Sequence, residues 1–308
     1  MRLLYELLLL FLFLFNNSVS LLNHVYPKST LQSLAAQNLL IYEYSNSFKL
    51  NKTQKLQEYL YENKEWDNMD KISKHSLNYL SRISPLGKVE LFENNEISDL
   101  QAGVTKSDLN KRICVVFRGS QSNIDWKYNI MTRKKYFNYI DYPKNEGKIG
   151  IHSGFYEHLH MGESYKNIDN TVFKLIKKYP NYEIYITGHS LGGALCTLYG
   201  YELSQKVNKK INVISFASPR LGNKWFKKKV ENIDNLNILR ITYKKDIVTC
   251  FPMFNYYHVG DNLYFSDNDY TFYNKDNPYS RFKYSIFNCY SISDHDMKNY
   301  YYKIRKLL

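Results

Sequence analysis

The chain has 308 residues, of which 44% are hydrophobic and 23% are charged, with only 7 Pro and 13 Gly. This composition excludes a disordered chain and a collagen-like chain, and the length suffices for a substantial hydrophobic core. The formal net charge of +13 is compatible with an anionic partner, but Lys, Asn, Ile and Tyr are all abundant, as AT-rich coding produces. Charge alone therefore assigns no partner.

The first 20 residues have the layout of a secretory signal peptide. Arg2 follows the initial methionine, an apolar run covers residues 7–15, and Ser18-Val19-Ser20 supplies the small residues of a cleavage site. The apolar run is shorter than the roughly 20 residues that span a bilayer, which disfavours a retained anchor. We therefore expect a secreted protein in which residues 1–20 are removed and residues 21–308 form one domain.

Helix-like and strand-like patterns alternate along the rest of the chain. The spacing of apolar residues predicts helices within residues 29–81, 154–178, 190–207 and 223–230, with a further helix near the C-terminus. Strands are predicted at residues 88–91, 113–117, 183–187, 211–216 and 236–243. Short apolar strands that alternate with amphipathic helices indicate a mainly parallel central sheet flanked by helices on both faces. The expected fold class is α/β, with helices at the start of the mature chain.

Secretion permits disulfide bonds, and the chain has four cysteines. Cys114 and Cys196 lie in apolar segments, where a buried free thiol is the usual outcome. Cys250 and Cys289 lie in irregular segments that contain Pro and Asn, so we predict that these two are bonded, although four cysteines allow three pairings. No CxxC pair or His-rich ligand spacing is present, which argues against a zinc site.

Residues 188–192 match the pattern G-x-S-x-G directly after a predicted strand. In this nucleophile elbow the serine occupies a strained turn between a strand and a helix, and small neighbours leave room for the reversal. The helix that follows points its first N–H groups toward a developing oxyanion. Ser190 is therefore the candidate nucleophile, and the N–H of Leu191 is a candidate oxyanion donor. The alternative is a glycine turn that serves packing alone.

A serine nucleophile needs a base, which is usually a histidine oriented by a carboxylate. With this elbow the chain order is Ser, then Asp or Glu, then His, which leaves only His258 and His295 among the eight histidines. Asp246 follows the predicted strand 236–243 and is the candidate acid, the alternative being an aspartate in a solvated basic loop. Spacing alone does not separate the two histidines.

At these residues the chain resembles the class 3 (fungal-type) triacylglycerol lipases, which are secreted α/β-hydrolases that act at oil–water interfaces. The resemblance covers roughly residues 80–305 and is carried by separated motifs in the family's order, at residues 114–120, 151–155, 188–192, 216–223, 246–248, 256–260 and 294–300. It implies a triad of Ser190, Asp246 and His295. It also implies that Ser120 is the second oxyanion donor and that His258 belongs to a structural element.

Residues 121–130 follow the oxyanion serine and resemble the short lid helix of these lipases. Ile124, Trp126 and Tyr128 would then face the site in water and turn toward lipid at an interface. Basic residues at 133–135 follow at once and would favour anionic membranes. The alternatives are a tryptophan that is simply packed and ordinary surface lysines.

The expected protein is a secreted serine ester hydrolase that cleaves acylglycerol esters at a lipid interface through an acyl-enzyme. No metal or organic cofactor is implied. The alternatives are a phospholipase or short-chain carboxylesterase with the same triad, or a catalytically silent secreted lipid-binding protein. Nucleic acid is not an expected partner, because the chain has no groove-reading motif. The sequence predicts no particular oligomeric state.

Overall fold

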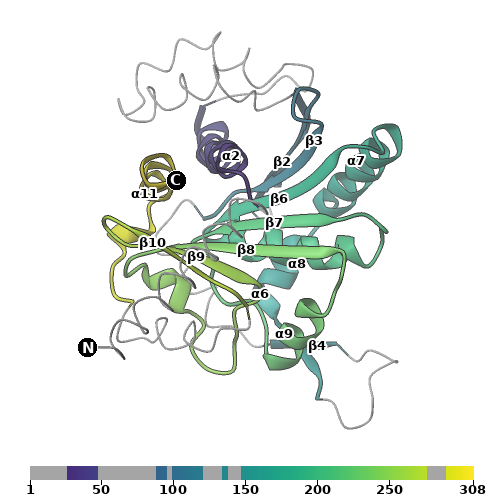
Figure 1. Cartoon of the computed structure of the whole chain (residues 1–308). Helices are drawn as coiled ribbons and strands as arrows, with labels where there is room; N and C mark the ends of the chain where they lie inside the picture. The colour runs from purple at the N-terminus through teal and green to yellow at the C-terminus, as the bar shows by residue number, and fades with distance from the viewer. Residues whose placement is uncertain (1–25, 48–87, 96–98, 121–133, 138–146, 276–288) are drawn as a thin grey trace, which may run out of the picture.

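The computed structural model describes residues 26–47, 88–95, 99–120, 134–137, 147–275 and 289–308 (Figure 1). Its centre is a sheet of eight strands in the order β1-β2-β3-β6-β7-β8-β9-β10. The strands are β1 (Lys88–Asn95), β2 (Leu100–Ser107), β3 (Arg112–Phe117), β6 (Glu183–His189), β7 (Ile211–Phe216), β8 (Leu236–Tyr243), β9 (Asp261–Phe265) and β10 (Tyr270–Tyr273). Neighbours from β3 to β9 are parallel, and the pairs at both edges are antiparallel. Two further strands, β4 (Lys134–Phe137) and β5 (Ile149–His152), form a separate antiparallel pair.

Helices cover both faces of the large sheet (Figure 1). One face carries α2 (Lys28–Ser47) and α11 (Met297–Leu307), whose apolar side chains share a core with the sheet. The other face carries α6 (Ser153–His160), α7 (Ser164–Lys178), α8 (Leu191–Ser204) and α9 (Lys224–Glu231). Two short 3₁₀ helices, η2 (Ile247–Cys250) and η3 (Ser293–His295), follow β8 and precede α11.

The central strands are buried along nearly their whole length because helices pack on both sides of them. Every residue of β3 and β7 is buried, which explains their nearly continuous apolar sequences. The mainly parallel sheet flanked by helices that the sequence predicts is therefore confirmed. No helix among the described residues has the length and apolar content needed to cross a membrane.

The structure differs from the sequence-based prediction in its helices and in its strands, where β2, β4, β5 and β10 were not predicted. The helix predicted at residues 154–178 is two helices, α6 and α7, because the chain turns at Gly162 with a φ of 75°. Strand β2 was not predicted, because its buried positions include polar side chains such as Gln101 and Thr105. These side chains bond to Asn94 and Gln37. Of the predicted helical region 29–81, residues 29–47 lie in α2 and the remainder lies outside the described residues.

The cysteines have the arrangement that the sequence predicts. Cys250 and Cys289 form a disulfide with an S–S distance of 2.07 Å, and Cys114 and Cys196 are buried free thiols. The disulfide ties the end of η2 to the segment that leads into η3. The predicted signal peptide at residues 1–20 lies outside the described residues.

Truncation of Phe117 tests the packing of the central sheet. Its side chain is fully buried and contacts the ring of Tyr199, with 5.6 Å between ring centroids. Phe117→Ala should lower the free energy of unfolding by about 3–5 kcal/mol, because it removes apolar contacts and leaves a cavity. Urea denaturation with the disulfide intact measures this change. Phe254→Ala is the control, because Phe254 is 80% exposed. Equal effects of the two substitutions would contradict this packing.

Removal of the disulfide tests its contribution to stability. The bond joins residues separated by 39 positions, and closing a loop of that length contributes roughly 2–4 kcal/mol through the unfolded state. The double substitution Cys250→Ser/Cys289→Ser should therefore lower the free energy of unfolding by that amount. A thiol reductant should destabilise the wild type equally and leave the double variant unchanged. Loss of stability in the reduced double variant would point to the other two cysteines.

Candidate active site

Ser190 lies in the turn that joins β6 to α8, with φ 59° and ψ −126°. Residues other than glycine rarely adopt this conformation. The turn is held by close contacts between main-chain segments. A Cβ atom at Gly188 would lie 2.0 Å from the carbonyl oxygen of Gly192, and one at Gly192 would lie 2.2 Å from that of Phe117. The G-x-S-x-G spacing is therefore a steric requirement of this turn.

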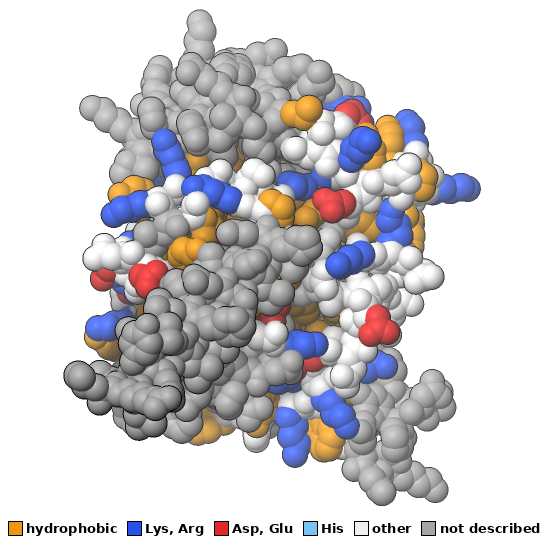
Figure 2. Space-filling model, viewed as in Figure 1, with side chains coloured by type: hydrophobic (Ala, Val, Ile, Leu, Met, Phe, Trp, Pro, Cys, Tyr) orange, Lys and Arg blue, Asp and Glu red, His pale blue; other side chains and the backbone are white. Residues whose placement is uncertain are grey.

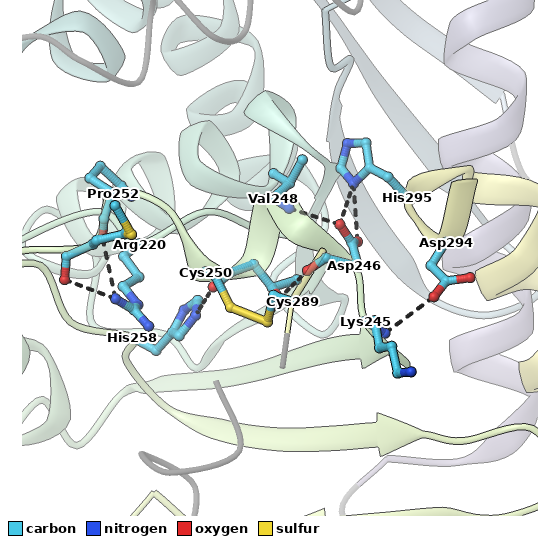
Figure 3. Close-up of a disulfide and its surroundings, with 12 residues drawn as sticks. Arg220, Lys245, Asp246, Val248, Cys250, Pro252, His258, Cys289, Asp294 and His295 are labelled. Carbon is cyan, nitrogen blue, oxygen red and sulfur yellow. Dashed lines mark hydrogen bonds and ion pairs between the residues drawn. A yellow bond between two sulfur atoms is a disulfide. The ribbon is translucent and has the colours of Figure 1, made fainter. Parts of the chain in front are cut away.

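Three residues from distant parts of the chain meet at this turn. Nε2 of His295 lies 2.8 Å from Oγ of Ser190, and Nδ1 of His295 lies 3.0 Å from each carboxylate oxygen of Asp246. Figure 3 shows the His295 ring above the Asp246 carboxylate. Because an ionised carboxylate only accepts hydrogen bonds, Nδ1 carries the proton and Nε2 is left to accept one from the serine hydroxyl.

The second candidate histidine, His258, does not contact Ser190 or Asp246. Nε2 of His258 donates to the carbonyl oxygen of Thr249 at 2.7 Å. Figure 3 places His258 across the disulfide from His295. The structure therefore brings His295, and not His258, into contact with Ser190 and Asp246, which spacing alone did not decide.

The Asp246 carboxylate is buried and fully engaged in hydrogen bonds. Besides His295, it accepts from the N–H of Val248 at 3.0 Å and from the hydroxyl of Tyr300 at 2.5 Å. It is 1% exposed, and its side chain caps the 3₁₀ helix η2. A buried carboxylate needs such donors to remain charged. Tyr300 belongs to α11, the helix that follows His295 in the chain. The same helix therefore also supplies a hydrogen bond to Asp246.

A second hydrogen-bond network, which no sequence pattern reveals, surrounds His189. Its Nε2 lies 2.8 Å from the main-chain oxygen of His295, and its Nδ1 lies 2.7 Å from the hydroxyl of Tyr42 on α2. The carbonyl can only accept, so Nε2 donates to it and Nδ1 accepts from Tyr42. Burial lowers the pKa of His189 well below its ordinary value, and repulsion from His295 lowers it further. No local pattern distinguishes Tyr42 among the 30 tyrosines.

The two candidate oxyanion donors lie beside the serine turn. Leu191 is the first residue of α8, and the first N–H groups of a helix have no acceptor within it. Ser120 is half-buried and follows β3, whose last residue approaches the start of α8 at Gly192. The candidate lid residues Ile124, Trp126 and Tyr128 lie outside the described residues. No group of three or more His, Cys, Asp or Glu in the described part of the chain could hold a metal ion.

Comparison with known proteins gives consistent matches. A protein-family model described as lipase (class 3) matches residues 114–256. Over 186 residues the chain is 32% identical to a lipase from Rhizopus niveus, in an alignment that covers 57% of this chain and 44% of the relative. It is 27% identical over 177 residues to phospholipase A1-IIgamma from Arabidopsis thaliana, covering 49% of this chain and 41% of the relative. The chain therefore spans less than half the length of these curated relatives.

A solved structure of Rhizomucor miehei triacylglyceride lipase superposes with a TM-score of 0.64 at 22% identity, covering 89% of this chain and 93% of that chain. The fold, with its serine turn between β6 and α8, is that of an α/β-hydrolase. Within that class, residues 114–256 match the class 3 lipase family, and the aligned part of the chain is similar to fungal lipases. The family match contains Ser190 and Asp246 and ends before His295, so the assignment of His295 rests on its contacts.

The buried His189 predicts a loss of stability in acid. Its pKa is lowered in the folded state, so below about pH 6.5 the unfolded chain binds a proton that the folded chain does not. The contribution of His189 to the free energy of unfolding is therefore fully present above that pH and is lost as the pH falls below it. Between pH 7.5 and 5.5 this one group therefore lowers the free energy of unfolding by on the order of 1 kcal/mol. His189→Gln should reduce the wild-type loss by a similar amount, measured by urea denaturation at both pH values. Identical losses in wild type and variant would contradict a neutral, buried His189.

Proposed function

We propose that this protein is a secreted serine ester hydrolase that cleaves acylglycerol esters at a lipid–water interface. The observation that carries the proposal is the position of His295 between Ser190 and Asp246, at hydrogen-bonding distance from both. The match of residues 114–256 to the class 3 lipase family model and the similarity to the lipase from Rhizopus niveus support the choice of substrate class.

In the proposed mechanism, His295 takes the proton of the Ser190 hydroxyl as the serine oxygen attacks the ester carbonyl. The N–H of Leu191 and Ser120 stabilise the negative oxygen of the tetrahedral intermediate. His295 then protonates the departing alcohol, which leaves an acyl group on Ser190. Water, deprotonated by the same histidine, hydrolyses this acyl-enzyme. Asp246 keeps the imidazole oriented and stabilises its charged form throughout.

We also propose that the reaction takes place outside the cell. Residues 1–20 act as a signal peptide, and residues 21–308 form one hydrolase domain. The Cys250–Cys289 disulfide supports secretion, because such bonds persist in oxidising compartments. We propose that Ile124, Trp126 and Tyr128, which lie outside the described residues, belong to a lid that covers the site in water. The partner is a lipid or other ester substrate at a peripheral interface, including an anionic membrane.

A phospholipase using the same three residues is the second candidate, and the match to an Arabidopsis phospholipase A1 favours it over a soluble esterase. The deciding experiment measures hydrolysis of a soluble short-chain ester, of triglyceride below and above its solubility limit, and of phospholipid. Ser190→Ala is the control. A sharp rise when the triglyceride interface forms supports a lipase. Activity confined to phospholipid supports the second candidate, and no Ser190-dependent hydrolysis of any substrate refutes both.

Substitution of Ser120 tests the proposed oxyanion hole. Ser120→Ala should lower kcat by roughly 100- to 1,000-fold, because one preorganised donor to the oxyanion is lost. Its thermal midpoint should stay close to wild type, since the side chain is only half-buried. Ser120→Thr retains a hydroxyl and should keep much more activity than Ser120→Ala. Near wild-type turnover in Ser120→Ala would exclude this residue from the oxyanion hole.

A further inference from the structure

Two carboxylates flank the histidine of the active site, and the proposed mechanism uses neither of them. Asp294 and Asp296 are the chain neighbours of His295. The side chain of Asp294 accepts from the main-chain N–H of Lys245 at 3.2 Å, and that of Asp296 accepts from the main-chain N–H of Lys298 at 2.9 Å. Neither carboxylate forms an ion pair with a described residue. These bonds therefore orient both carboxylates without cancelling their charge.

The two carboxylates have different surroundings. Figure 3 shows Asp294 directed at Lys245. The pKa of Lys245 is raised, first by its hydrogen bond with Tyr290 and then by the charge of Asp294. Asp296, by contrast, is exposed and caps the first turn of α11. The N–H groups at the start of a helix stabilise a negative charge there. Asp296 is therefore the carboxylate whose charge is accessible to a bound molecule.

Asp296 lies on the histidine side of the nucleophile. The main-chain oxygen of His295, which belongs to the peptide bond that leads into Asp296, accepts from Nε2 of His189 at 2.8 Å. His189 directly precedes Ser190, and its ring centroid lies 4.7 Å from that of His295. The backbone at Asp296 is thus held against the turn that carries the serine.

The charge of Asp296 acts on a residue inside the site. Tyr42 donates to Nδ1 of His189 at 2.7 Å. Burial raises the pKa of Tyr42, the charge of Arg118 lowers it, and the charge of Asp296 raises it. Arg118 is 3% exposed, and its Nη2 lies 2.6 Å from Oδ1 of Asp99. The positive charge near Tyr42 is therefore paired and covered, whereas the negative charge of Asp296 is exposed.

We propose that Asp296 selects the alcohol part of the ester by its charge, favouring cationic and neutral leaving groups over anionic ones. In the mechanism above, His295 protonates the departing alcohol, so this part of the substrate leaves on the side where Asp296 lies. A carboxylate there attracts a cation and repels an anion. Acylglycerols and choline esters fit this rule, and phosphatidic acid does not. The inference rests on the proposed function, because it requires an ester that is cleaved at Ser190.

The charge of the whole protein works in the opposite direction. The formal net charge is +13, and Figure 2 shows more lysine and arginine than acidic side chains on the described surface in that view. A field of this sign attracts anions to the protein in general. A preference for a cationic leaving group would therefore report a local carboxylate and not the net charge.

The test compares two soluble esters of the same shape, butyrylcholine and the analogue in which a tert-butyl group replaces the trimethylammonium group. The measured quantity is the ratio of their kcat/KM values at low ionic strength. Asp296→Asn should lower this ratio by roughly threefold or more, because one charge beside the leaving group is lost. Asparagine keeps an oxygen that can cap α11, so kcat/KM for the uncharged ester should stay within about twofold of wild type. Added salt should reduce the difference between the two proteins.

Glu183→Gln is the matched control, because it removes the same charge from an exposed position far from the site. Glu183 begins β6, and Ser190 follows the other end of that strand, so the two residues are roughly 20 Å apart. This variant should keep the wild-type ratio. Because the ratio is taken within each protein, a partial loss of folded protein does not change it.

The outcomes separate this inference from the proposed function. An unchanged ratio in Asp296→Asn, or an equal change in Glu183→Gln, refutes the role of Asp296. If the uncharged ester is still hydrolysed in a Ser190-dependent manner, the proposed function stands in either case. No Ser190-dependent hydrolysis of any ester refutes the proposed function, and this inference fails with it.

Discussion

The turn at Ser190 is the constraint around which the rest of this structure is arranged. Its backbone conformation costs on the order of 1–3 kcal/mol for a residue with a side chain. The surrounding main chain holds it in place. The N–H of Ser190 donates to the carbonyl of Phe216 on β7 at 3.0 Å, and the N–H of Gly193 donates back to the carbonyl of Ser190 at 2.9 Å. Contacts with β6, α8 and β7 thus hold Ser190 in an unfavourable conformation that presents its hydroxyl to His295.

The site depends on both faces of the sheet. Helix α8 and the elbow belong to the face that also carries α6, α7 and α9, whereas His295 and Tyr300 come from the opposite side with α11. Tyr42 on α2 bonds to His189, and His189 bonds to the main chain at His295. Docking of α2 and α11 is therefore coupled to the position of the imidazole. A buried, neutral His189 is well suited to this link because it both donates and accepts.

Sequence reasoning succeeded where the signal was local. Apolar runs such as residues 113–117 predicted central strands because both faces of those strands are buried. The elbow was recognisable because its serine and glycines lie within five consecutive positions, and the contact that requires Gly188 is with Gly192 in the same segment. The break at Gly162 and the polar positions of β2 were missed, since their partners lie elsewhere in the chain. For the same reason the contact of Tyr42 with His189 left no pattern in the sequence.

The most direct test of the account is whether Ser190 is a nucleophile activated by His295. Mature protein is treated with a fluorophosphonate, and the modified peptide is identified by mass spectrometry in wild type and in His295→Ala. The account predicts modification of Ser190 that slows by at least about 100-fold in the variant, because the general base is lost. Modification of another serine, or equal rates in the two proteins, would contradict it.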